Sequence, residues 1–403
     1  MATQLNSSFE GLVKAKSVPG IGAVILDKSG KRLYDSSFGT INANDENAKP
    51  FTNDTHLFLW SCTKLITSLC TLQLVEQGKV SLSDPVTKHL PKDNFQVCER
   101  LDENSKPVLR NPKTEMTLLH LMTHTSGLTY DFFGSDTLLY DYRAAKGQAG
   151  ASLLTLSEEW QYNDAFLAFD PGARHHYGAN IDRLGFIIEE VSGMRLEEYM
   201  AKHIFEPLGM KNSGPQFKGE DWLRVHMKDM EGKLTAVEAV QPPKAPWRFG
   251  GGHFLVSTLN DYSQVLLALL NGGKHPGTGE RILKDETVRD YVFKDFIPEV
   301  GCTGEGIGVC GQSLLPGLSN AGDVGAALPG VPRGWSCGLM INKEDVPGLR
   351  KEGSGAWAGL GNLYYWIDAK SGVAGIIGSE ILPFLDPDVV GLFTEVEKFA
   401  YAG

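Results

Sequence analysis

The stretch Trp60-Ser61-Cys62-Thr63-Lys64 opens a run that continues to Gly78, and the interpretation of the whole chain starts from it. Gln77 and Gly78 close the run with residues typical of a helix C-terminus. Within it the apolar residues recur at helical spacing: Leu65, Ile66, Leu69, Leu72 and Val75. The run therefore predicts a helix with Ser61 in its first turn.

Ser61 and Lys64 are three positions apart, so in a helix their side chains project from the same face. A serine hydroxyl becomes a good nucleophile when a base takes its proton, and a lysine can be that base when partial burial lowers its pKa. A helix N-terminus adds a positive field where negative charge develops. The same pattern is typical of a serine N-cap followed by an exposed lysine, so both interpretations stay open on this stretch alone.

Composition and charge exclude several classes of protein. A chain of 403 residues with 42% hydrophobic and 22% charged residues is typical of a soluble globular protein of two or three lobes. The net charge of -11 argues against nucleic acid or an anionic membrane as the main partner. No segment approaches the roughly 18 to 20 apolar residues of a membrane span, and the polar N-terminus resembles neither a signal peptide nor a transit peptide. We therefore expect a cytoplasmic protein.

Cysteines and histidines give no pattern typical of a metal site. The six cysteines have no C-x-x-C pairing, and Cys62 is interpreted as a packing residue because no histidine beside it would activate the thiol. His120 and His124 are four positions apart in a helix predicted over 116–128, which could suit a metal. No third ligand is apparent, so buried histidines bonded to backbone are favoured. We expect no metal and no cofactor.

Strand patterns occur at both ends of the chain. Residues 21–26 and 32–38 predict a hairpin around a Gly-containing turn, and 333–342, 361–368 and 373–379 read as further strands before a helix over 386–401. We expect one antiparallel sheet flanked by helices, an α/β (α+β) fold. In this single unit, residues 1–60 and 330–403 form the sheet lobe, 61–250 a mostly helical lobe, and 251–329 a helix with Gly-rich loops.

The middle of the chain is predicted to be mainly helical, with helices over 181–191, 195–205 and 258–270. The aromatic segment 130–151 is either a mobile lid or pocket wall, or an ordinary surface loop. Tyr177 precedes a helix start, where local sequence favours a packing role. Gly250-Gly251-Gly252 lacks the Gly-Lys-Ser/Thr of a phosphate loop, so it is expected to permit close backbone packing.

Five motifs in order resemble those of class C β-lactamase-like serine hydrolases. They are Ser61-Cys62-Thr63-Lys64, Leu121-Met122-Thr123-His124-Thr125-Ser126-Gly127-Leu128, Pro171-Gly172 with Tyr177-Gly178-Ala179-Asn180, Gly250-Gly251-Gly252 and Trp357-Ala358-Gly359. The likeness covers nearly the whole chain. Within the family, the chain most resembles fungal acyltransferases and esterases of polyketide metabolism, including the statin side-chain transferase and lovastatin-hydrolysing esterases. A β-lactamase/transpeptidase-like fold is implied.

The resemblance also implies roles for individual residues. Ser61 is expected to be the nucleophile, and Lys64 and Tyr177 to share the base role. The backbone N–H groups of Ser61 and Leu360 are expected to form the oxyanion hole. Four positions are expected to bind substrate: Trp357, Gly359, Tyr130 and Asn180. Two departures from the family pattern weigh against a β-lactam substrate. Trp357 takes the place of the lysine that attracts the carboxylate of penicillins, and Ala179 stands at the usual place of the asparagine that follows the tyrosine.

Together these patterns predict a cofactor-free serine esterase that hydrolyses or transfers the acyl group of a bulky apolar secondary-metabolite ester through an acyl-Ser61 intermediate. Trp357 and the aromatic segment 130–142 would wall the pocket. Three alternatives stay open: a transesterase of polyketide biosynthesis with a carrier-bound acyl donor, a penicillin-binding protein or β-lactamase, and a scaffold without catalysis. In each enzyme case the partner is a small molecule.

Overall fold

The computed structural model describes the chain except residues 134–136, 151–165, 242–247, 326–329 and 403. Parts of the predicted aromatic segment and of the Gly-rich loops predicted within 251–329 therefore lie outside the described residues. The main sheet has seven antiparallel strands in the order β11-β12-β13-β14-β15-β1-β2. Their bounds are β1 Gly20–Asp27, β2 Arg32–Gly39, β11 Arg333–Trp335, β12 Met340–Asn342, β13 Gly355–Gly359, β14 Leu363–Asp368 and β15 Val373–Gly378.

The two ends of the chain meet in this sheet. β1 pairs with β15 in a register that places Gly22 opposite Gly378 and Asp27 opposite Val373. β1 and β15 are buried along nearly their whole lengths, which explains why both read as continuous apolar runs instead of alternating ones. The prediction that the N-terminal hairpin and the C-terminal strands share one antiparallel sheet is confirmed.

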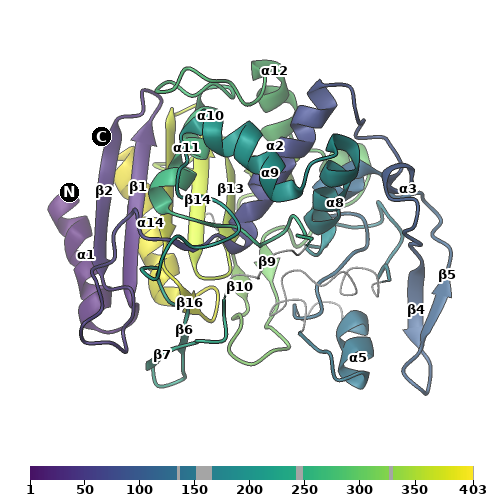
Figure 1. Cartoon of the computed structure of the whole chain (residues 1–403), viewed down its shortest axis with the longest axis horizontal. Helices are drawn as coiled ribbons and strands as arrows, with labels where there is room; N and C mark the ends of the chain where they lie inside the picture. The colour runs from purple at the N-terminus through teal and green to yellow at the C-terminus, as the bar shows by residue number, and fades with distance from the viewer. Residues whose placement is uncertain (134–136, 151–165, 242–247, 326–329, 403) are drawn as a thin grey trace.

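Helices cover both faces of the sheet (Figure 1). α1 (Ala2–Lys14) and α14 (Pro387–Tyr401) pack together on one face, and α11 (Leu259–Leu270) packs against β1, β14 and β15 on the other. α2 (Thr63–Glu76) is almost entirely buried because α8 (Asn180–Ser192) packs against it. This burial places the first turn of α2 in the interior, between the sheet and the helical region.

The remaining elements are short. They are β3 Leu57–Phe58, η1 Trp60–Cys62, α3 Val86–His89, β4 Val97–Leu101, β5 Pro107–Arg110, α4 Leu118–Met122, α5 Leu138–Ala145, α9 Leu196–Met200, η2 Ala201–Phe205, α10 Glu206–Leu208, β6 His226–Lys228, β7 Leu234–Ala236, β8 Val256–Ser257, α12 Asp285–Thr287, η3 Val288–Val292, α13 Ile297–Val300, β9 Val309–Cys310, β10 Gly322–Asp323 and β16 Ile381–Leu382. β3 and β8 form a two-stranded pair that leads the chain into η1.

Three predicted elements differ from the structure. The single strand expected over 333–342 is two strands, because the Ser336 hydroxyl accepts the Leu339 N–H at 3.0 Å and stabilises a turn between them. The helix expected over 116–128 ends at Met122, since His124 has a φ of 54° that a helix cannot continue through. The helix expected over 195–205 changes to a π-helical turn at Ala201.

Several long helices agree closely with prediction. α8, α11 and α14 begin and end within one or two residues of the ranges expected from periodicity and caps.

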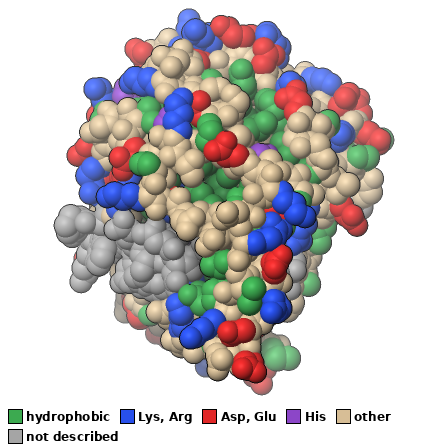
Figure 2. All heavy atoms as spheres, turned by 90° about the vertical axis from the view of Figure 1, so that its right-hand side faces the viewer, with side chains coloured by type: hydrophobic (Ala, Val, Ile, Leu, Met, Phe, Trp, Pro, Cys, Tyr) green, Lys and Arg blue, Asp and Glu red, His purple; other side chains and the backbone are tan. Residues whose placement is uncertain are grey.

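Figure 2 shows acidic and basic side chains interspersed over the face that carries the helical region. Among the described residues, no helix has the length and hydropathy needed to cross a membrane.

Candidate active site

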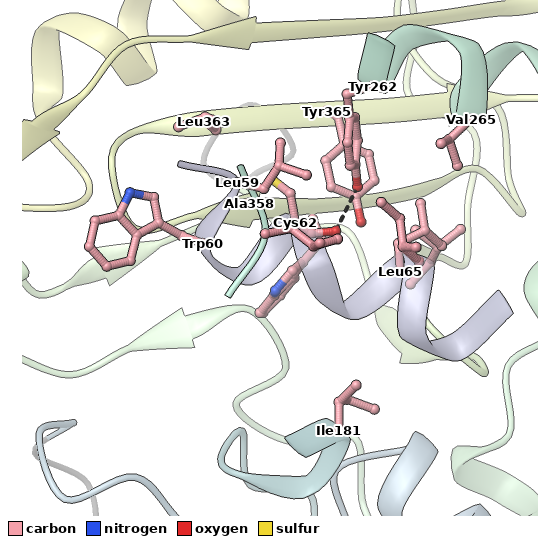
Figure 3. Packing of buried hydrophobic residues seen from close by; sticks show 14 of the residues in the cluster. Leu59, Trp60, Cys62, Leu65, Ile181, Tyr262, Val265, Ala358, Leu363 and Tyr365 are labelled. Atoms are coloured by element: carbon pink, nitrogen blue, oxygen red, sulfur yellow. Dashed lines mark hydrogen bonds between the residues drawn. The ribbon is translucent and has the colours of Figure 1, made fainter. Parts of the chain in front are cut away.

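Ser61 lies at the junction between the β3–β8 pair and α2. The Leu59 N–H donates to the Leu255 carbonyl at 2.9 Å, and Trp60 then adopts a φ of 46°, which turns the chain sharply into η1. Ser61 is thus in a short 3-10 turn, and α2 begins two residues later. Figure 3 shows this junction enclosed by Leu363 and Tyr365 from the sheet on one side and Ile181 of α8 on the other, with the Tyr262 hydroxyl donating to the Cys62 carbonyl at 2.9 Å.

Lys64 is buried beside Ser61, and three partners surround its ammonium nitrogen. Nζ lies 3.1 Å from Ser61 Oγ, 3.0 Å from the Tyr130 hydroxyl and 3.0 Å from the Gly252 carbonyl. Burial lowers the pKa of Lys64 to about 8, and the negative charge of Asp182 opposes this shift. A substantial fraction of Lys64 is therefore neutral near physiological pH, which an exposed lysine is not.

Asp182 organises the partners of Lys64 from α8. Its Oδ2 accepts the Tyr130 O–H at 2.9 Å, and its Oδ1 accepts the Gly252 N–H at 3.1 Å and lies 3.4 Å from His253 Nδ1. Burial alone would raise the pKa of Asp182, but hydrogen bonds and charges, above all from His253 and Lys64, hold it at about 2. Asp182 is therefore ionised and fixes the direction of the Tyr130 hydrogen bond.

That direction determines what Lys64 can do. Because Tyr130 donates its hydroxyl proton to Asp182, the Tyr130 oxygen is available to accept from Lys64. The Gly252 carbonyl can only accept. A neutral amine has two N–H groups and one lone pair, so these two acceptors take both N–H groups. The lone pair then faces the third partner, the Ser61 hydroxyl.

Tyr177 approaches Ser61 from the segment before α8. Its hydroxyl accepts the Trp357 indole N–H at 3.3 Å, and its ring lies 4.8 Å from Lys64 Nζ, centroid to nitrogen. Burial raises the pKa of the Tyr177 phenol above its usual range, and a hydrogen bond with Ser61 opposes part of that shift. Tyr177 is therefore a neutral phenol within reach of the Ser61 hydroxyl.

Aromatic rings hold Tyr177 in place. The centroid of its ring lies 4.6 Å from that of His124, 4.9 Å from Trp357 and 6.2 Å from Phe133. Burial lowers the pKa of His124 well below its usual range, so this ring is neutral. His120 instead caps α4 through its Nδ1, which accepts the Thr117 N–H at 3.1 Å. His120 and His124 therefore do not share a helix face, because His124 lies beyond the end of α4.

The second backbone N–H predicted for the oxyanion hole, that of Leu360, directly follows β13. A Cβ added to Gly359 would lie 2.6 Å from the Leu59 carbonyl oxygen, so only glycine lets β13 approach η1 this closely. The next residue, Leu360, lines the same pocket as Ser61. Within the described part of the chain, neither the Ser61 N–H nor the Leu360 N–H donates to a protein acceptor. Both remain available to a bound molecule.

A small apolar pocket opens at Ser61. Besides Ser61 it is lined by Trp60, Tyr130, Phe132, Phe133, His253 and Leu360. The expectation that residues from the aromatic segment wall a pocket is confirmed for Tyr130, Phe132 and Phe133. Tyr142 lies elsewhere, on α5 against Phe166.

The other two predicted substrate contacts have different surroundings. Asn180 is fully buried, with its Oδ1 bonded to the Ser126 hydroxyl and its Nδ2 donating to the Leu128 carbonyl at 3.1 Å, so it holds the turn after α4. Trp357 is buried against Tyr177 and Trp335, with its ring centroid 4.6 Å from that of Trp335. Direct contact of Asn180 and Trp357 with substrate stays a prediction.

Sequence reasoning missed Asp182, His253 and the Gly252 carbonyl. Asp182 carried a usable signal, since a carboxylate at a position otherwise facing the core is unusual. The prediction for Gly250-Gly251-Gly252 is confirmed: a Cβ on Gly252 would lie 2.4 Å from Asp182 Oδ2.

Cys62 is fully buried and burial raises its thiol pKa, in agreement with a packing role. Among the described residues, no three His, Cys, Asp or Glu side chains gather as a metal would require.

Comparison with known proteins gives consistent matches. The Beta-lactamase family model matches residues 5–388. The chain is 29% identical to monacolin J acid methylbutanoyltransferase of Aspergillus terreus, over 99% of this chain and 95% of that protein. It is 26% identical to lovastatin esterase of Penicillium rubens, over 96% of this chain and 94% of the other.

Solved structures agree with the sequence matches. A mutant simvastatin synthase of Aspergillus terreus superposes with a TM-score of 0.82 at 27% identity, covering 99% of this chain and 96% of that one. The predicted β-lactamase/transpeptidase-like fold is therefore confirmed. The family match spans nearly the whole chain, and the named relatives are enzymes of acyl transfer and ester hydrolysis. The chain belongs to the Beta-lactamase family and is an enzyme.

Proposed function

We propose that this protein is a serine esterase or acyltransferase that carries an acyl group on Ser61. The observation that supports this most strongly is the set of three partners around Lys64 Nζ, which leaves one position of the amine directed at Ser61 Oγ at 3.1 Å. Neutral Lys64 accepts the Ser61 proton as Oγ attacks the carbonyl carbon of the ester. The tetrahedral intermediate then collapses to acyl-Ser61 and the departing alcohol.

Tyr177 completes proton transfer in this proposal. A phenol whose pKa is raised by burial is a poor base, but it donates and accepts a proton in a relay. Lys64 passes the proton through Tyr177 to the leaving oxygen, and the alcohol departs neutral. In the second half of the reaction the steps reverse, as the incoming water or alcohol gives its proton to Lys64.

The backbone N–H groups of Ser61 and Leu360 stabilise the negative charge of the tetrahedral intermediate. Both are free of protein acceptors within the described residues, and both border the pocket. Donors fixed by the backbone cost no reorganisation when the charge develops, which is why such sites contribute strongly to catalysis.

The substrate class proposed is an ester of a bulky, largely apolar secondary metabolite. The pocket walls of Trp60, Phe132, Phe133 and Leu360 suit an apolar acyl group. The relatives named above include a methylbutanoyltransferase of monacolin J acid and a lovastatin esterase, so both hydrolysis and transfer are represented among similar proteins. We favour hydrolysis for this chain, with transfer from a carrier-bound donor as the second candidate, and we propose a cytoplasmic location.

The test is turnover of p-nitrophenyl butyrate by the wild type and by Ser61→Ala. We expect Ser61→Ala to lose essentially all turnover and to keep its fold, because the Ser61 hydroxyl makes no capping hydrogen bond at the start of η1 or α2. Retained turnover in the folded variant would contradict the proposal. If the proposal holds, comparing metabolite extracts incubated with the wild type and with Ser61→Ala would identify the natural ester.

Two controls separate the alternatives. Cys62→Ser changes the neighbouring nucleophilic atom and should leave the Ser61-dependent rate within a few-fold of wild type. Nitrocefin tests the β-lactamase alternative, for which we expect at most slow turnover, since Trp357 stands where penicillin-binding relatives carry a lysine. A scaffold without catalysis would turn over neither compound.

A further inference from the structure

Glu380 is a buried carboxyl group that the mechanism above does not use. It follows β15 and is 0% exposed, and its Oε2 accepts the Trp60 indole N–H at 3.0 Å. The carboxyl group thus binds Trp60, the residue immediately before Ser61.

Trp60 is the most unusual residue of this junction. Its φ of 46° lies in the left-handed region, which residues with bulky side chains rarely adopt and which persists only where the surrounding structure enforces it. The Trp60 side chain is 3% exposed and lines the pocket at Ser61. In Figure 3 the Trp60 indole lies on one side of the helix start, and Tyr262 and Val265 lie on the opposite side. The hydrogen bond to Glu380 is therefore well placed to fix both this backbone turn and one wall of the pocket.

The protonation state of Glu380 suits this role. Burial raises the pKa of Glu380 well above its usual range, and among the described residues its Oε1 has no hydrogen-bond partner. A neutral carboxylic acid keeps a carbonyl oxygen that accepts from Trp60 without placing a charge beside the reaction. Glutamine has nearly the same shape and the same acceptor, so it should replace Glu380 in this function.

We propose that Glu380 is a positioning residue for acyl transfer: by holding Trp60 in its left-handed conformation, it places the Ser61 hydroxyl and N–H for attack and shapes the acyl pocket. The inference rests on the proposed function of Ser61. It adds that the rate of acylation depends on a contact made by a residue that does not touch the substrate. Small displacements of a nucleophile are costly, since about 1 Å can reduce a rate about 100-fold.

The experiment measures the single-turnover rate of Ser61 acylation by p-nitrophenyl butyrate in three full-length variants. Glu380→Leu removes the acceptor and should slow acylation about 10- to 100-fold. Glu380→Gln keeps the acceptor and should restore the rate to within about threefold of wild type. Glu397→Gln is the matched control: it alters another 0% exposed carboxyl group, which lies on α14 and pairs with Arg350, and should acylate at the wild-type rate while folded.

Two results would overturn the inference. One is a folded Glu380→Leu variant with the wild-type acylation rate, and the other is a Glu380→Gln variant as slow as Glu380→Leu. If Glu380→Leu does not fold, Trp60→Phe decides, because it removes the indole N–H and keeps an aromatic wall. We expect Trp60→Phe to be slowed at least several-fold, and an unchanged rate would reject the inference. Failure of the proposed function is recognised separately, since the wild type would then form no acyl-Ser61.

Discussion

Lys64 and Tyr177 both reach Ser61, but different forces hold them there. Lys64 is held by hydrogen bonds to Tyr130 and Gly252, which are organised in turn by ionised Asp182. Tyr177 is held mainly by ring packing and by one hydrogen bond from Trp357. The polar arrangement sets the pKa of Lys64 and the direction of its lone pair, whereas the aromatic arrangement sets the position of the Tyr177 hydroxyl. The two sides should therefore respond differently to substitutions that keep volume and remove polar atoms.

The largest effect should come from Lys64→Met, which keeps the length of the side chain and removes the base. General-base catalysis contributes about 10²- to 10⁴-fold, so we expect a loss of at least that size in kcat/KM for p-nitrophenyl butyrate. Residues that act as a unit are strongly non-additive, so adding Tyr177→Phe should lower the rate little further. Fully additive losses would show that the two residues work independently.

Tyr177→Phe should have the next largest effect. It removes only the hydroxyl and leaves the ring packed against His124 and Trp357, so stability and KM should barely change while kcat falls about 100-fold. Thermal unfolding and steady-state kinetics measure the two quantities. A near-wild-type kcat would show that Tyr177 only lines the pocket and that Lys64 is the sole base.

Asp182→Asn tests the polar side through pH. The negative charge of Asp182 raises the pKa of Lys64 against the effect of burial, so removing the charge should lower that pKa below about 8. Because the neutral amine is the active form, kcat/KM rises with pH through the Lys64 pKa. The acidic limb of the profile should therefore move to lower pH in Asp182→Asn. A shift to higher pH, or none, would contradict this electrostatic assignment.

The smallest effect should come from Trp357→Phe, which deletes the N–H that donates to Tyr177 at 3.3 Å and keeps an aromatic ring. One neutral hydrogen bond is worth about 0.5 to 1.5 kcal/mol, so kcat should fall about 2- to 10-fold. Trp357→Ala also removes ring packing and should fall further. Equal losses in both variants would mean that packing does not position Tyr177.

The same contrast explains what could be predicted from sequence. Helical spacing predicts that Lys64 lies on the same face as Ser61, and the family motifs supply the expected roles of Lys64 and Tyr177, because both signals are local in the chain. Asp182 and the Gly252 carbonyl were missed, since they meet Lys64 only after α8 and the segment before β8 pack against α2. The centre of the main sheet was predictable because β1 and β15 are strongly apolar runs. The end of α4 was not, because a single residue, His124, adopts a positive φ.

The central claim is that Ser61 carries the acyl group and that Lys64 loads it. The most direct measurement is mass spectrometry of the peptide that contains Ser61, after mixing the protein with p-nitrophenyl butyrate and quenching within the first turnover. We predict a butyryl mass increment on Ser61 in the wild type that is absent in Ser61→Ala and forms far more slowly in Lys64→Met. An increment on Cys62, or an unmodified peptide during active turnover, would contradict the account.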